Sequence, residues 1–210
     1  MGIRAVRVLV YLLAFLIGAY AVIQYGFFKP QDAGLVSIKL RNPDFHLEPW
    51  VYVMYVHIIT GVLALIIGPF QLFLSKAGTT RLKWHRLMGY LYVISISISG
   101  LVNMYLSFFA TGGWIAGLGF FTLDVLWVAF TWMSVYKISR KDNHAHREWM
   151  LRSYALTFAA VTLRLLLPVL ILLFHGNFIP AYQMVAWMSW VVNLVIVEVM
   201  IRSRHHHRKG

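Results

Sequence analysis

The most informative part of this 210-residue sequence is Trp50–Leu74, which reads WVYVMYVHIITGVLALIIGPFQLFL and contains no Asp, Glu, Lys or Arg. About 20 consecutive apolar residues are enough to cross the hydrocarbon core of a bilayer as a helix. The apolar residues follow one another without the alternation of a strand, and a chain in lipid must satisfy its own backbone hydrogen bonds. This stretch therefore predicts a transmembrane helix.

Five other stretches have the same character, and the composition of the whole chain agrees with them. Hydrophobic residues make up 60% of the sequence and charged residues 12%, whereas soluble domains average about 45–50% and about 25%. We expect helices at Val8–Phe28, Trp50–Leu74, Leu87–Ala110, Leu118–Tyr136, Met150–Phe174 and Tyr182–Ile201. The predicted fold is all-α: a polytopic membrane protein with a bundle of six transmembrane helices, forming a single domain over residues 1–210.

Basic residues gather on one side of the predicted membrane, and the other side carries only Lys29, Lys39 and Arg41. The basic side holds Arg4, Arg7, Lys76, Arg81, Lys83, Arg86, Lys137, Arg140, Lys141, Arg147, Arg152, Arg202, Arg204, Arg208 and Lys209. Segments rich in Lys and Arg stay in the cytoplasm, so both termini are predicted to be cytoplasmic. The net charge of +12 thus reflects topology, and we expect contact with the lipid bilayer and no nucleic-acid partner.

The first span has a second interpretation. Arg4 and Arg7, an apolar core and Ala19-Tyr20-Ala21 together resemble a secretory signal peptide with its cleavage site. We expect an uncleaved helix, and either interpretation leaves Trp50 on the outer side.

Two pairs of His and Arg open the third and fifth spans at the cytoplasmic level. They are His85-Arg86 and His146-Arg147, and His144 lies two residues before the second pair. The chain has no Cys, so a metal would be held by His, carboxylate or Met. Imidazoles on facing helices can supply both axial ligands of a b-type haem, and neighbouring arginines can neutralise its propionates. The alternative is a set of interface anchors, and either His144 or His146 could be the ligand.

A second group of polar residues is predicted inside the membrane, nearer the outer side. With a rise of about 1.5 Å per residue, His57, Asn103, Asp124 and Arg164 fall at one depth on four spans. Intramembrane ionisable residues mark functional sites by default, and Asp124 with Arg164 is the expected ion pair. The cluster would suit a quinone headgroup, a proton or a small polar substrate; the alternative is a buried ion pair that fixes helix register. We also expect Glu198 to snorkel or to pair with a basic residue.

Several short strings together resemble a known family. They are His57-x-x-x-Gly61, Gly68-Pro69-Phe70-Gln71, Trp84-His85-Arg86-x-x-Gly89-x-x-Tyr92, His146-Arg147-x-Trp149-Met150-x-Arg152-Ser153-Tyr154-Ala155 and Thr162-Leu163-Arg164. On these strings the chain resembles a bacterial domain-of-unknown-function family of six-helix membrane proteins. That resemblance implies a location in the bacterial inner membrane.

The architecture is also distantly similar to the membrane cytochromes b, including the transmembrane ascorbate ferrireductases. That similarity implies haem ligands at His85 and His146, and a further ligand position at His57. The fourth span departs from the two-haem pattern, because it carries Asp124 and no His, so one haem is the expectation.

The sequence thus favours an integral membrane redox protein that binds one haem b through His85 and His146 and exchanges electrons with a quinone or small substrate. One alternative is a non-enzymatic subunit or assembly factor of a larger membrane complex, or a homo-oligomer, with Gly100 and Gly119 on contact faces. A small-solute transporter is the third.

The haem hypothesis predicts a coloured protein. A reduced-minus-oxidised visible spectrum of protein purified from haem-supplied cells should show the sharp bands of a six-coordinate b-type haem. His85→Ala or His146→Ala should abolish them, because each removes an axial ligand. A flat spectrum from the unaltered protein would contradict the hypothesis.

Overall fold

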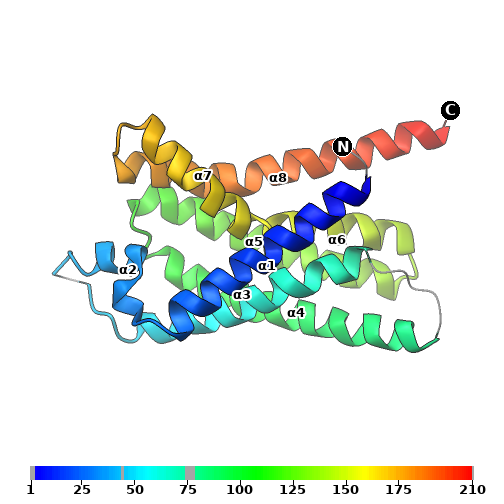
Figure 1. Cartoon of the computed structure of the whole chain (residues 1–210). Coiled ribbons are helices and arrows are strands. Elements are labelled where there is room, and N and C mark those ends of the chain that lie inside the picture. Colours follow the sequence, from blue (N-terminus) through cyan, green and yellow to red (C-terminus); the bar gives the residue numbers. More distant parts are fainter. Residues whose placement is uncertain (1–2, 44, 74–78, 210) are drawn as a thin grey trace.

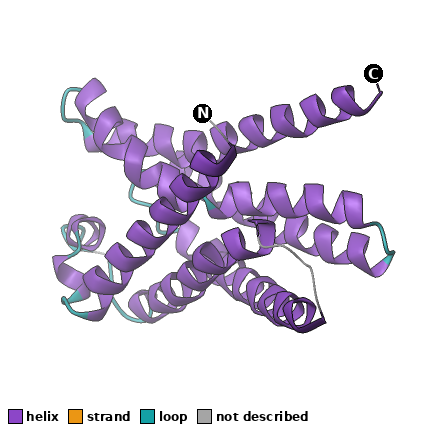
Figure 2. Cartoon of the chain, turned by 45° about the vertical axis from the view of Figure 1, so that its right-hand side comes forward, coloured by secondary structure: helices purple, strands orange, loops and turns teal. Residues whose placement is uncertain are grey.

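The structure is a computed structural model that describes residues 3–43, 45–73 and 79–209, and these residues form helices and connecting turns without a strand (Figures 1 and 2). The elements are α1 (Ile3–Gly26), η1 (Pro30–Asp32), α2 (Gly34–Lys39), α3 (Trp50–Phe73), α4 (Thr79–Ser107), α5 (Gly113–Ser139), α6 (Asn143–Thr157), α7 (Ala159–Leu173) and α8 (Phe178–Lys209). η1 is a short 3-10 turn, and with α2 it occupies the loop between the first two spans.

The six predicted spans are confirmed as helices long and apolar enough to cross a membrane. Their outward faces carry large exposed apolar side chains such as Phe15, Leu101 and Leu172, as contact with lipid requires. Several helices run further than expected: α4 begins at Thr79, α6 at Asn143, and α8 continues to Lys209. Hydropathy detects only the part of a helix that lies in hydrocarbon, whereas polar residues extend it into the interface. The expected boundary at Leu74 and the basic residue Lys76 lie outside the described residues.

The fifth span is two helices. α6 ends at Thr157 and α7 begins at Ala159, while Pro168 lies inside α7. At the break, the Phe158 N–H donates to Tyr154 O at 2.8 Å, and the Val161 N–H donates to Phe158 O at 3.0 Å. The second bond spans only three residues, so the helix tightens there. This break sets the course of α7 past the rest of the bundle.

The helices pack mainly as neighbouring pairs: α3 with α4, α5 with α6, and α7 with α8, while α1 crosses α3 (Figure 1). Both termini lie at one end of the bundle, opposite α2. We call these the termini end and the α2 end.

Two glycines that the sequence assigned to partner contacts are used inside the bundle instead. A Cβ on Gly100 would lie 2.5 Å from Val128 Cγ2, and one on Gly119 would lie 3.1 Å from the Ala186 carbonyl oxygen. The missing side chains let α4 approach α5 and let α5 approach α8. These positions therefore form no free contact face.

A proline in α3 allows hydrogen bonds that connect α3 to α1 and α6. Pro69 has no N–H, so the carbonyl of Leu65, four residues earlier, lacks its partner within the helix. The Tyr154 hydroxyl of α6 donates to that oxygen at 3.3 Å, and the Tyr11 hydroxyl of α1 donates to the Pro69 oxygen at 3.1 Å. The Tyr154 ring reaches this position because it lies directly against Gly68.

Gly68→Ala should therefore destabilise the protein. The added Cβ would lie 2.2 Å from the Tyr154 ring, and overpacking of this kind costs about 1–3 kcal/mol. Thermal unfolding in detergent should show a lower midpoint than for the unaltered protein.

Gly89→Ala is the matched control, since its Cβ would meet only Gln71 Oε1 at 3.8 Å. It should leave the midpoint unchanged or raise it, because Ala favours a helix over Gly by about 1 kcal/mol. Equal midpoints for the two variants would contradict the packing described here.

Candidate functional site

A cavity of about 610 Å³ occupies the half of the bundle nearer α2. Its walls come from α1, α2, α3, α4, α5, α6, α7 and α8, and most of the lining is apolar. All four residues of the polar group expected from the sequence line this one cavity: His57, Asn103, Asp124 and Arg164.

Asp124 is buried and is held by Asn103, not by an arginine. The Asn103 Nδ2 atom donates to both carboxylate oxygens, at 3.0 and 2.9 Å. Among the described residues no ion pair joins Asp124 to Arg164. The expectation that these two residues pair is therefore wrong. Helix rise fixes the depth of a residue, whereas the direction of its side chain depends on rotation about the helix axis, which depth alone does not give.

Arg164 turns toward its own helix and toward α1. Its Nη1 atom donates to the Ala160 carbonyl oxygen at 2.9 Å, and its guanidinium carbon lies 5.9 Å from the centroid of the Tyr20 ring. No carboxylate in the described part of the chain neutralises this charge. A cation in a largely apolar cavity is costly without an anionic or strongly accepting partner. The guanidinium is therefore positioned to receive one from a ligand.

His57 is oriented by Ser99 of the neighbouring helix. Its Nδ1 atom lies 2.9 Å from Ser99 Oγ and 3.3 Å from the Ser99 carbonyl oxygen, while Ser99 Oγ donates to the His57 carbonyl at 3.2 Å. A carbonyl only accepts, so we assign the proton of the neutral ring to Nδ1. Nε2 is then an acceptor, and it has no partner within the described residues.

Lys39, the last residue of α2, also lines the cavity. Its ammonium group donates to the Phe109 carbonyl and lies 5.2 Å from the centroid of the Trp50 ring. Burial lowers the pKa of Lys39 to about 8. In the sequence, Lys39 stands out only as one of three basic residues on the predicted outer side. The scarcity of basic residues on that side was the only indication that Lys39 has a special role.

Two further residues of the wall each have a buried polar atom that lacks a partner within the described ranges: Trp50 Nε1 and Ser189 Oγ. Buried polar groups in folded proteins are nearly always hydrogen-bonded. Two such groups on residues that also line the cavity, together with a guanidinium that has no carboxylate partner in the described part of the chain, are unusual for a purely structural interior.

Where the cavity ends at Thr157, by contrast, four hydroxyls of the described residues are bonded to one another. Thr157 Oγ1 contacts the Tyr92 hydroxyl at 3.0 Å and accepts from Trp127 Nε1 at 2.8 Å. Ser153 Oγ contacts the Tyr92 hydroxyl at 3.0 Å and Thr131 Oγ1 at 2.7 Å. This network joins α4, α5 and α6. Tyr92 and Ser153 occur in the sequence strings that resemble the family, whereas Thr131 and Thr157 were not predicted, since hydroxyls in apolar helices have no spacing signature.

The chain matches the family described as "Predicted membrane protein (DUF2306)" over residues 54–201. The chain belongs to this family. The match confirms the expected membrane family of unknown function. No curated protein and no solved structure matches the chain.

The four polar cavity residues all lie within the DUF2306 region, whereas Lys39 and Trp50 precede it. Five spans, from α3 to α8, therefore belong to the matched part, and α1 with α2 completes the cavity from outside it.

The expected haem ligands lie nearer the termini end. His146 Nδ1 lies 2.9 Å from the Ser134 carbonyl oxygen, an anchoring that metal-ligating histidines commonly show. However, His85 and His146 line neither described cavity, and Met88, Tyr92 and Met150, one or two turns deeper, pack into one hydrophobic cluster. Haem ligation at His85 and His146 therefore stays a prediction.

The arginines expected to neutralise haem propionates, Arg86 and Arg147, are both exposed. Arg147 lines a second, smaller cavity with His144 and Glu148. The expected pairing of Glu198 is confirmed, because Arg152 Nη2 donates to Glu198 Oε2 at 3.1 Å.

Proposed function

We propose that this DUF2306 protein is an integral membrane redox protein whose cavity binds the headgroup of a lipid-soluble quinone. The observation that carries the proposal is a set of polar groups whose bonding capacity the described residues do not satisfy, on residues that line one cavity of about 610 Å³. Arg164 donates to a backbone carbonyl and has no carboxylate partner in the described part of the chain. Nε2 of His57 is an acceptor, and the buried Nε1 of Trp50 and hydroxyl of Ser189 have no partner within the described ranges. A mostly apolar pocket with a few convergent polar groups is the usual form of a small-molecule site.

The chemistry of a quinone suits these groups. Its two carbonyl oxygens accept hydrogen bonds, and they gain negative charge and protons on reduction. Arg164 and Lys39 supply positively charged donors, which bind a developing oxyanion more strongly than neutral donors do. Asp124 and His57 are the groups in the wall that exchange protons. Electrons would come from a separate donor, and haem b remains the candidate that the sequence offers.

Quinone binding can be measured through the fluorescence of two tryptophans that line the cavity, Trp50 and Trp127. Decylubiquinone titrated into the detergent-purified protein should quench tryptophan fluorescence in a saturable manner. Arg164→Met should weaken binding about 10- to 100-fold, since a hydrogen bond to a charged group contributes about 1.5–3 kcal/mol.

Arg140→Met is the control, because Arg140 is exposed beyond the end of α5, and it should bind as the unaltered protein does. Equal affinities for the Arg164 and Arg140 variants would contradict the proposed site.

The same titration has an expected pH dependence. The Lys39 ammonium, whose pKa is about 8, is charged at pH 7 and neutral at pH 9, so quinone affinity should fall several-fold between these values. Lys39→Arg stays charged throughout and should remove the fall. A fall of the same size in that variant would assign the effect to another group.

We further propose that the protein spans the bacterial inner membrane with both termini in the cytoplasm, which places the cavity in the outer half. The location of both termini at the basic end supports this. The chain has no cysteine, so single cysteines report topology directly. In intact spheroplasts a membrane-impermeant maleimide should label Asp32→Cys and not Ser203→Cys. Labelling of Ser203→Cys before lysis would reverse the orientation.

A further inference from the structure

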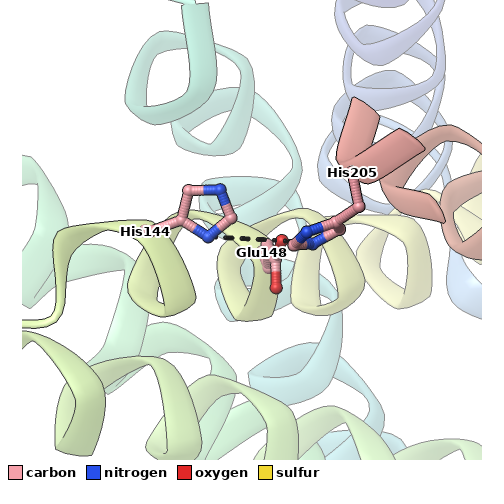
Figure 3. Close-up of side chains that lie close together, drawn as sticks. All are labelled: His144, Glu148 and His205. Atoms are coloured by element: carbon pink, nitrogen blue, oxygen red, sulfur yellow. Dashed lines mark hydrogen bonds and ion pairs between the residues drawn. The ribbon is translucent and has the colours of Figure 1, made fainter. Parts of the chain in front are cut away.

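The termini end carries a cluster of metal-ligating side chains that the quinone site does not use. His144 and Glu148 stand one turn apart on α6, and His205 of α8 faces them (Figure 3). The His144 Nδ1 atom lies 3.4 Å from Glu148 Oε1, and His205 Nε2 lies 2.7 Å from the same oxygen. One ligand atom from each residue lies within 4.8 Å of the other two.

We propose that His144, Glu148 and His205 bind a divalent transition-metal ion, with zinc the best match. Two imidazole nitrogens and one carboxylate oxygen form a common three-ligand set for zinc, which leaves a fourth position to water or an anion.

The distances suit such an ion. Ligand atoms about 2.1 Å from zinc in a tetrahedron are about 3.4 Å from one another. The contact between His144 and Glu148 already has that length, and the shorter contact of His205 needs to open by about 0.7 Å. His144 and His205 are exposed at the surface, so rotation of their side chains meets little resistance.

The surroundings set the character of the site. A cavity of about 270 Å³ is lined by the three ligands together with Arg147, Leu151, Ile201 and Arg204. The two guanidiniums oppose a bare cation and attract an anion, so we expect a small anion in the fourth position. A bound ion would fasten the end of α8 to α6.

This site is independent of the proposed quinone cavity, with which it shares no lining residue. His205 also lies beyond the DUF2306 region, which ends at residue 201.

A run of adjacent histidines can capture metal without any built site, and His205 is followed by His206 and His207. The two explanations differ in what they need. A histidine run binds through His205, His206 and His207, whereas the built site needs His144 and Glu148 and does not need the last two histidines.

The test is a Zn²⁺ titration of the full-length protein in detergent, in competition with a chromophoric chelator. We expect one ion per chain. His144→Asn and Glu148→Gln should each weaken binding at least about tenfold. The control is the double variant His206→Asn/His207→Asn, which should bind within about twofold of the unaltered protein. Loss of binding in the control, or its retention in both His144→Asn and Glu148→Gln, would overturn the proposal.

Thermal unfolding distinguishes a variant that has lost the metal site from a variant that fails to fold. Zn²⁺ should raise the unfolding midpoint of the unaltered protein and of the double variant, because it binds only the folded state. It should leave the midpoint of His144→Asn unchanged. A zinc-dependent rise in His144→Asn equal to that of the unaltered protein would also overturn the proposal.

Discussion

The hydrogen bonds that converge on Thr157 hold the centre of the molecule. Its hydroxyl contacts Tyr92 of α4, accepts from Trp127 of α5 and donates to the Ser153 carbonyl of α6 at 3.0 Å. In a bilayer no water replaces a lost partner, so these groups must stay together. Thr157 is also the last residue of α6, next to the break at Phe158. The network therefore sets where α7 begins and, with it, where Arg164 meets the cavity.

The contrast between the two halves of the bundle supports the proposed function. The hydroxyls of Tyr92, Thr131, Ser153 and Thr157 are bonded to one another, which stabilises the fold. Among the described residues, Trp50 and Ser189 of the cavity wall each have a buried polar atom without a partner, and Arg164 has no carboxylate partner. Buried polar groups without partners are rare in folded proteins, so those on the residues of the cavity wall support the proposal that a ligand binds there.

The sequence was sufficient for the six spans, because long apolar runs report burial in lipid without any knowledge of packing. It also brought His57, Asn103, Asp124 and Arg164 to one depth, since helix rise is constant. The sequence did not predict contacts that depend on the rotation of a helix about its axis or on the folding of a loop. The partner of Asp124 is Asn103, and Lys39 reaches the cavity from a short helix in a loop. The break at Phe158 could not be predicted, because no proline or glycine lies next to it in the sequence. Haem ligation and membrane orientation stay predictions.

The most direct test of the ligand-binding cavity is an experimental density map of the protein in lipid nanodiscs with decylubiquinone. We expect headgroup density inside the cavity, within hydrogen-bond distance of Arg164 and of His57 Nε2, with Asp124 still held by Asn103. A map in which the Arg164 guanidinium turns onto the Asp124 carboxylate and closes the cavity would contradict it. That result would make the polar group a structural ion pair.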